Sequence, residues 1–164
     1  MSKGLVVVDS SVLIFLLESE PADTTRRRRW LGVQSCLEGL EREGTDLVIP
    51  APAVAELESV SPQLDALAKR MYRFEVRAFD VQAALVAGRM LRATVSAGVR
   101  GDESKVRVKY DALIAATAVR WGAEAIVTTD TRGFAKYLDA VQSQVEIRFA
   151  DGAKGQLAMM PKKQ

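Results

Sequence analysis

The chain has 164 residues, of which 48% are hydrophobic and 27% charged, a balance typical of one globular domain. It contains no histidine and a single cysteine, which excludes Ser-His-Asp catalysis, His-ligated zinc and internal disulfides. Any bound metal is therefore expected to be a hard cation held by carboxylates. The formal net charge of +2 indicates little about partners. The low cysteine content favours the cytoplasm, and no apolar run is long enough to cross a membrane.

Short β-branched runs alternate with segments of helical periodicity along the chain. The strands are expected at residues 5–8, 47–49, 74–79, 125–128 and 145–149. The helices are expected at 10–17 with Ser10 as cap, 30–40, from 52, 61–71, 81–95 with Asp80 as cap, 110–121 and near 134–138. Polar loops are expected at 20–25 and 100–108. This order predicts an α/β fold with a central, mostly parallel sheet of about five strands and helices on both faces.

No internal repeat or linker divides the chain. We therefore predict one domain over residues 1–150, followed by a loose C-terminal tail over residues 151–164.

Four acidic residues lie where this topology brings chain segments to one edge of the sheet. Asp9 and Asp130 end predicted strands, Glu56 lies in the first turns of a helix, and Asp111 lies at the start of another. Gathered carboxylates repel one another, and a divalent cation such as Mg²⁺ relieves that repulsion. Each of the four residues also has a simpler interpretation as a helix cap, a helix-dipole partner or a solvated side chain. Asp80 occupies a similar position between a strand and a helix, and for it we prefer the interpretation as a cap.

Four segments resemble the motifs of PIN-domain nucleases, in the order in which that family carries them. The segments are VVVDSSVLI at 6–14, IPAPAVAEL at 49–57, DALIAATA at 111–118, and AEAIVTTD at 123–130 followed by Phe134. The resemblance spans about residues 5–149. It implies an α/β/α sandwich, a Mg²⁺- or Mn²⁺-dependent ribonuclease activity, and an acidic site made of Asp9, Glu56, Asp111 and Asp130.

The resemblance also assigns roles within that site. Asp9, Asp111 and Asp130 are expected to hold the metal directly or through water, and Glu56 is expected to position the attacking water or accept its proton. Ser10, Thr128 and Thr129 are expected to support the site, with helix capping or strand-end hydrogen bonding as the alternative.

VapC-like toxins of toxin–antitoxin pairs are the branch of the family most similar in size. They imply a homodimer neutralised by a small antitoxin protein. The segment 20–44 and the tail after Phe149 are longer than that branch requires. The alternative function is a PIN-like module that binds RNA or a protein without cutting, although all four acidic positions are filled.

Two basic segments are candidate contacts for RNA phosphates. The first is the run Arg26 to Arg29; the second precedes Asp111 and contributes Lys105, Arg107 and Lys109. The alternative for the run is a solvated helix start or a contact with an acidic partner protein.

Overall fold

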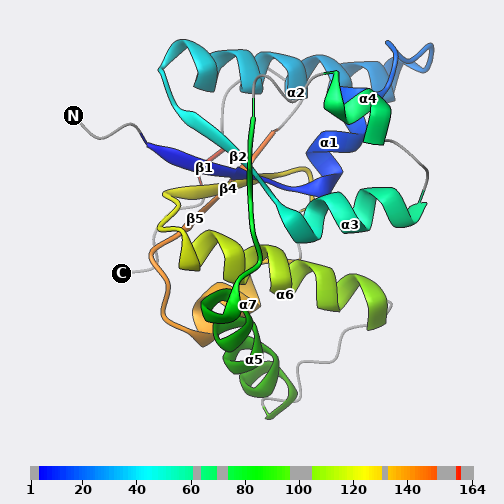
Figure 1. Cartoon of the computed structure of the whole chain (residues 1–164). Helices are drawn as coiled ribbons and strands as arrows, with labels where there is room; N and C mark the ends of the chain where they lie inside the picture. The colour runs from blue at the N-terminus through cyan, green and yellow to red at the C-terminus, as the bar shows by residue number, and fades with distance from the viewer. Residues whose placement is uncertain are drawn as a thin grey trace.

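The computed structural model describes residues 4–60, 64–69, 74–96, 105–130, 133–150 and 158–159. A six-stranded sheet lies at its centre, in the order β3-β2-β1-β4-β5-β6 (Figure 1). The strands are β1 (Leu5–Val8), β2 (Asp46–Pro50), β3 (Glu75–Arg77), β4 (Ala125–Thr128), β5 (Glu146–Phe149) and β6 (Ala158–Met159). The first five strands pair in parallel, and β6 pairs antiparallel to β5. The predicted parallel sheet is confirmed.

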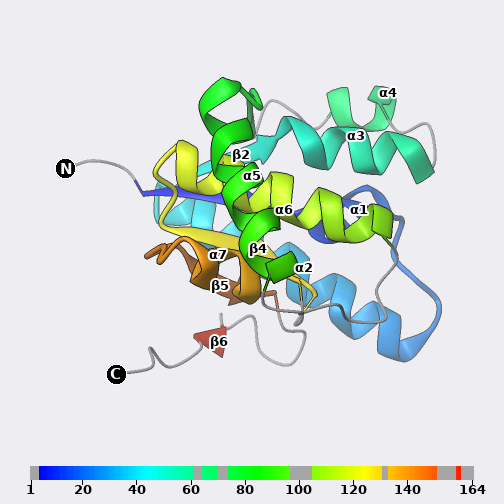
Figure 2. The same ribbon diagram turned by 90° about the horizontal axis from the view of Figure 1, so that it is seen from below.

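Helices cover both faces of the sheet. The helices are α1 (Ser10–Leu17), α2 (Thr24–Arg42), α3 (Ala51–Val60), α4 (Leu64–Ala68), α5 (Val81–Ser96), α6 (Lys105–Arg120) and α7 (Ala135–Ala140). The long helix α2 lies on one face, and α6 lies on the other with α5 and α7 outside it (Figures 1 and 2). The architecture is therefore the α/β/α sandwich that the sequence predicts.

The central strands form because their side chains are buried on both faces of the sheet. All four residues of β4 are buried, and so are the three valines of β1. A strand of this kind reads as a continuous apolar run without alternation. Because β1, β2 and β4 are parallel neighbours, their carboxyl ends lie at one edge of the sheet, where Asp9, α3 and Asp130 follow them.

Several predicted boundaries were wrong. Helix α1 begins at Ser10 with Asp9 in the capping position, so Ser10 is not the cap. Helix α2 begins at Thr24, inside the predicted loop, because the Asp23 carboxylate accepts a hydrogen bond from the Arg26 backbone N–H at 2.8 Å. Helix α6 begins at Lys105, so residues 105–108 are helical and not part of a loop.

The predicted cap at Asp80 and the predicted C-terminal tail can also be compared with the structure. The Asp80 cap is confirmed, since its carboxylate accepts from the Ala83 backbone N–H at 2.9 Å. Within the predicted loose tail, Ala158 pairs with Phe149 and Met159 with Arg148, which adds the sixth strand. Residues 61–63, 70–73, 100–104 and most of the tail lie outside the described residues, so expectations for them are untested. The boundary at residue 150 stays a prediction.

Among the described helices, none has both the length and the apolar character that crossing a bilayer requires.

Candidate functional site

Asp9 is the most buried acidic residue at the carboxyl edge of the sheet, with 3% of its surface exposed. It occupies the capping position of α1, but its side chain makes no capping hydrogen bond. Its Oδ2 atom instead accepts hydrogen bonds from the hydroxyls of Ser11, at 2.6 Å, and Thr128, at 2.8 Å. Its Oδ1 atom lies 3.3 Å from the Ser10 hydroxyl. The side chain is thus oriented toward β4 and does not serve as a helix cap.

The two hydroxyls on Oδ2 also connect Asp9 to the chain that follows β4. The Thr129 backbone N–H donates to Ser11 Oγ at 3.1 Å, and the Asp130 backbone N–H donates to Thr128 Oγ1 at 2.9 Å. A hydroxyl can accept one hydrogen bond while it donates another. Each of the two hydroxyls therefore accepts a hydrogen bond from a backbone N–H and donates one to Asp9. Thr128 therefore contacts Asp9 directly through its hydroxyl, whereas the Thr129 main chain reaches Asp9 only through the Ser11 hydroxyl.

Glu56 joins the same network from α3. Its Oε2 atom accepts the Ser10 hydroxyl at 2.6 Å, a short distance typical of a hydroxyl bonded to a charged carboxylate. Ser10 is buried and lies next to Asp9 in sequence. The structure thus brings Asp9, Ser10 and Glu56 together and ties the backbone of Asp130 to them.

Asp111 lies in the second turn of α6, which begins at Lys105, so its predicted place at the helix start was wrong. It is 6% exposed, so it is not a solvated side chain, and its place beyond the first turn weakens its interaction with the helix dipole. A Cβ atom on Gly133 would lie 2.6 Å from Asp111 Oδ2. The glycine therefore allows the backbone at residue 133 to lie directly against the Asp111 carboxylate.

Burial raises the pKa of Asp9 above its ordinary value, although hydrogen bonds from Ser11, Thr128 and Ser10 lower it in part. A nearby cation would favour the charged form of this carboxyl. The described residues contain no ready-made group of three or more carboxylate, imidazole or thiol ligands. Mg²⁺ needs no such cage, because proteins usually bind it through one or two carboxylates and several waters. The oxygen ligands present match a hard divalent cation in chemical type.

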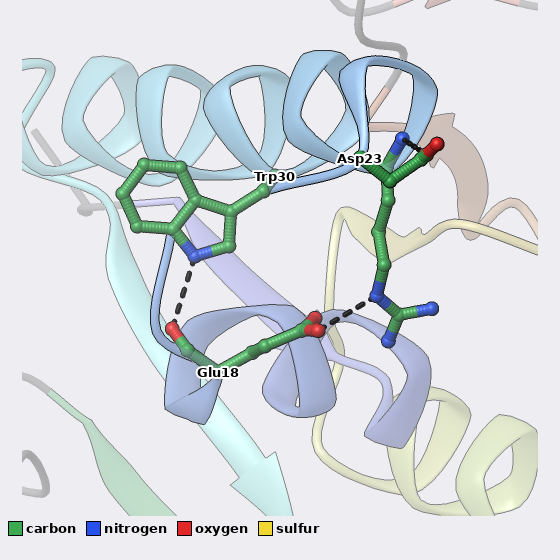
Figure 3. A network of polar contacts seen from close by, with 4 residues as sticks. Glu18, Asp23 and Trp30 are labelled. Carbon is green, nitrogen blue, oxygen red and sulfur yellow. Dashed lines mark hydrogen bonds and ion pairs between the residues drawn. The ribbon is translucent and has the colours of Figure 1, made fainter. Parts of the chain in front are cut away.

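The arginine run lies on the first turns of α2, where its side chains are exposed. Arg26 Nε donates to Glu18 Oε1 at 2.7 Å, beside the Trp30 indole that donates to the Glu18 carbonyl at 3.1 Å (Figure 3). Arg27 forms an ion pair with Glu20, and Arg29 stacks on the Phe15 ring. Part of the run therefore fastens α2 to α1 and to the segment that follows it.

The second basic segment belongs to α6. Lys109 is exposed and lies two residues before Asp111. Lys105 and Arg107 are helical residues, and their predicted role in binding RNA stays untested.

Sequence reasoning missed two residues of this network, Ser11 and Gly133. The sequence signal for Ser11 is its place two residues after Asp9 at a helix start, from which a hydroxyl reaches back to the carboxylate. Gly133 carried no signal of its own, because its contact with Asp111 joins segments that are separate in sequence.

Residues 6–138 match the model of the PIN domain family, and the chain therefore belongs to that family. No curated protein matches the chain. The family match confirms the resemblance predicted from the four motifs.

Solved structures share the fold. A chain in the crystal structure of VapBC2 from Rickettsia felis, bound to a DNA fragment from their promoter, is 16% identical with a TM-score of 0.62. That match covers 87% of this chain and 98% of the other. DNA-bound VapBC from Salmonella typhimurium is 20% identical with a TM-score of 0.57, covering 92% and 99%. FitAcB from Neisseria gonorrhoeae is 21% identical with a TM-score of 0.54, covering 85% and 95%.

Proposed function

We propose that the chain is a divalent-metal-dependent endoribonuclease whose acidic site consists of Asp9, Glu56, Asp111 and Asp130. The observation that carries the proposal is the hydroxyl network around Asp9, which links Glu56 and the backbone of Asp130 to one buried carboxylate. Helix capping alone does not explain a buried carboxylate that makes no capping hydrogen bond and accepts hydrogen bonds from the hydroxyls of Ser11 and Thr128. Membership of the PIN domain family supports the same conclusion.

Asp9, Asp111 and Asp130 would hold the cation, Mg²⁺ or Mn²⁺. When bound, such a cation supplies positive charge that stabilises the developing negative charge on the phosphodiester. The burial of Asp9 and Asp111 supports this assignment, because it raises the cost of leaving their charge uncompensated. The close approach of Gly133 limits the space around the Asp111 carboxylate.

The chain's own residues would perform the remaining tasks of phosphodiester hydrolysis. Glu56 would orient the attacking water or accept its proton, because each carboxylate oxygen can accept more than one hydrogen bond. Ser11 and Thr128 would hold the Asp9 carboxylate in one orientation. The exposed arginines of α2, with Lys105, Arg107 and Lys109, would bind RNA phosphates and position the strand.

The finer assignment is the toxin of a toxin–antitoxin pair, acting as a homodimer and neutralised by a small antitoxin. The similar folds in the VapBC and FitAcB crystal structures support it. An adjacent small reading frame whose product binds the chain and stops cleavage would support the toxin role, whereas an active nuclease with no such partner would limit the proposal to the ribonuclease.

Cleavage of a defined RNA by the purified chain, with the fragment ends mapped, tests the activity. We expect internal cuts by the wild type and by Asp139→Asn, a control on an exposed aspartate of α7. Asp111→Asn is expected to remain folded and to cut nothing. An RNA that binds the wild type without being cut would favour a PIN-like binding module instead.

A further inference from the structure

Ser10 and Ser11 are adjacent, yet their hydroxyls serve different carboxylates. Ser11 Oγ lies 2.6 Å from Asp9 Oδ2. Ser10 Oγ lies 2.6 Å from Glu56 Oε2 and 3.3 Å from Asp9 Oδ1. A hydroxyl has one proton, and the shorter distance indicates the stronger bond, so Ser10 donates to Glu56.

We infer that Ser10 is a positioning residue that holds the Glu56 carboxylate beside Asp9, an inference that rests on the proposed role of Glu56. Glu56 reaches the site from α3, 46 residues away in sequence. A glutamate side chain has several rotatable bonds, and ordering it costs conformational entropy. A short bond to a buried hydroxyl selects the conformer in which the carboxylate faces Asp9.

Because the two hydroxyls bond to different carboxylates, substitutions at Ser10 and Ser11 have different expected effects. A simple loss of packing would not distinguish them. Removing the Ser10 hydroxyl deletes its bond to the Glu56 carboxylate but leaves both hydroxyls on Asp9 Oδ2 in place. Removing the Ser11 hydroxyl disturbs Asp9, a proposed metal ligand, and leaves the bond between Ser10 and Glu56. Ser10 therefore acts on the step that uses Glu56, whereas Ser11 acts on cation binding.

Ser59 provides a matched control. Its hydroxyl also bonds to Glu56, but to the main-chain carbonyl, at 2.7 Å, and it is exposed. Ser59→Ala makes the same chemical change as Ser10→Ala without touching the Glu56 carboxylate. It is expected to leave cleavage and cation binding unchanged.

The experiment measures RNA cleavage kinetics and Mn²⁺ affinity for wild type, Ser10→Ala, Ser10→Thr, Ser11→Ala and Ser59→Ala. We expect Ser10→Ala to lower kcat by about 10- to 100-fold, the usual cost of losing such a supporting bond, with KM and the Mn²⁺ Kd nearly unchanged. Ser10→Thr, which keeps the hydroxyl, should recover most of kcat. Ser11→Ala should instead weaken Mn²⁺ binding. Equal kcat for Ser10→Ala and wild type would overturn the inference.

Two further measurements keep the inference separate from the proposed function. In a Glu56→Gln background, Ser10→Ala should lower kcat no further, because residues that act as one unit are not additive; a full additional loss would overturn the inference. A crystal structure of Ser10→Ala should show the Glu56 carboxylate turned away from Asp9, and an unmoved carboxylate would contradict the positioning role. If wild type cuts no RNA yet Glu56 moves in this variant, the nuclease proposal fails and the positioning role stands.

Discussion

Thr128 donates its hydroxyl to Asp9 Oδ2 at 2.8 Å, although 119 residues separate the two in sequence. The contact follows from the pairing of β1 with β4, which sets the ends of these parallel strands side by side. The Asp9 backbone N–H extends that pairing, since it donates to the Val127 carbonyl at 3.0 Å. The sheet register therefore places a hydroxyl donor against the buried carboxylate.

The first prediction concerns pH. Burial raises the pKa of Asp9 in the folded chain above its ordinary value of 3.8. The folded chain therefore holds the Asp9 proton more tightly than the unfolded chain does. The stability that this proton contributes is fully present below pH 3.8 and is lost as the pH rises through the folded pKa. Without added metal, Asp9→Asn should unfold at a higher temperature than wild type at neutral pH, and the difference should shrink as the pH falls toward 3.8. Melting curves across a pH series measure this.

Asp80 provides the control of opposite sign. The backbone N–H of Ala83 and then the Arg120 side chain lower the pKa of Asp80 below its ordinary value. Asp80→Asn should therefore destabilise the chain at neutral pH, and less so as the pH falls through the folded pKa. If the two variants showed the same pH trend, the assignment of a buried, costly charge at Asp9 would be wrong.

The second prediction concerns Gly133. A Cβ at this position would lie 2.6 Å from Asp111 Oδ2, so Gly133→Ala must displace the carboxylate or the loop. Misplacement of a catalytic group by about 1 Å can cost 100-fold in rate. We expect Gly133→Ala to lower kcat by at least about tenfold in a cleavage assay while the chain remains folded.

Gly88 in α5 is the matched control for that substitution. A Cβ there would meet nothing within 4 Å. Gly88→Ala should raise the free energy of unfolding by about 0.5–1 kcal/mol, since alanine is the better helix former, and should leave cleavage unchanged. Equal activity of both glycine variants would show that the approach of residue 133 to Asp111 has no role in the reaction.

The third prediction concerns the arginines of α2. Replacing Arg26 to Arg29 together by alanine should weaken RNA binding and flatten its salt dependence, by a slope of about 0.7 for each lost phosphate contact on a single strand. Cleavage at saturating RNA should change little, because these side chains would bind ground and transition states alike. Affinities across a salt series measure the effect.

Within that run, Arg26 and Arg27 already have acidic partners, Glu18 and Glu20. Arg28→Ala should therefore reduce RNA affinity more than Arg26→Ala does. Arg42→Ala, at the other end of the same helix, should bind RNA like the wild type. Superimposable salt curves for the quadruple variant and wild type would direct attention to a protein partner.

The sequence was sufficient to predict the sheet and the segments that carry the acidic residues. Buried strands such as β4 are short, mostly apolar and followed by polar residues, so their ends can be located along the chain. The start of α6 was placed too late because its first residues, Lys105 to Lys109, lack the apolar periodicity that begins near Tyr110. Asp111 consequently seemed to lie at a helix start.

The distribution of hydroxyls around Asp9 could not be predicted. Ser10 and Ser11 are adjacent residues of the same type. Successive residues of a helix are rotated by about 100°, and this rotation alone directs the Ser10 hydroxyl to Glu56 and the Ser11 hydroxyl to Asp9. The short pairing of β6 with β5 was also not predictable, because a two-residue strand carries no periodic signal.

The measurement that tests the account most directly is RNA cleavage by the purified wild type under control of the divalent cation. We predict cleavage with Mg²⁺ or Mn²⁺, complete loss in EDTA, and recovery when excess Mg²⁺ is added back. The same preparation of Asp111→Asn should be inactive in every condition. Robust cleavage in EDTA by a preparation free of contaminating ribonuclease, or cleavage by Asp111→Asn at the wild-type rate, would contradict the account.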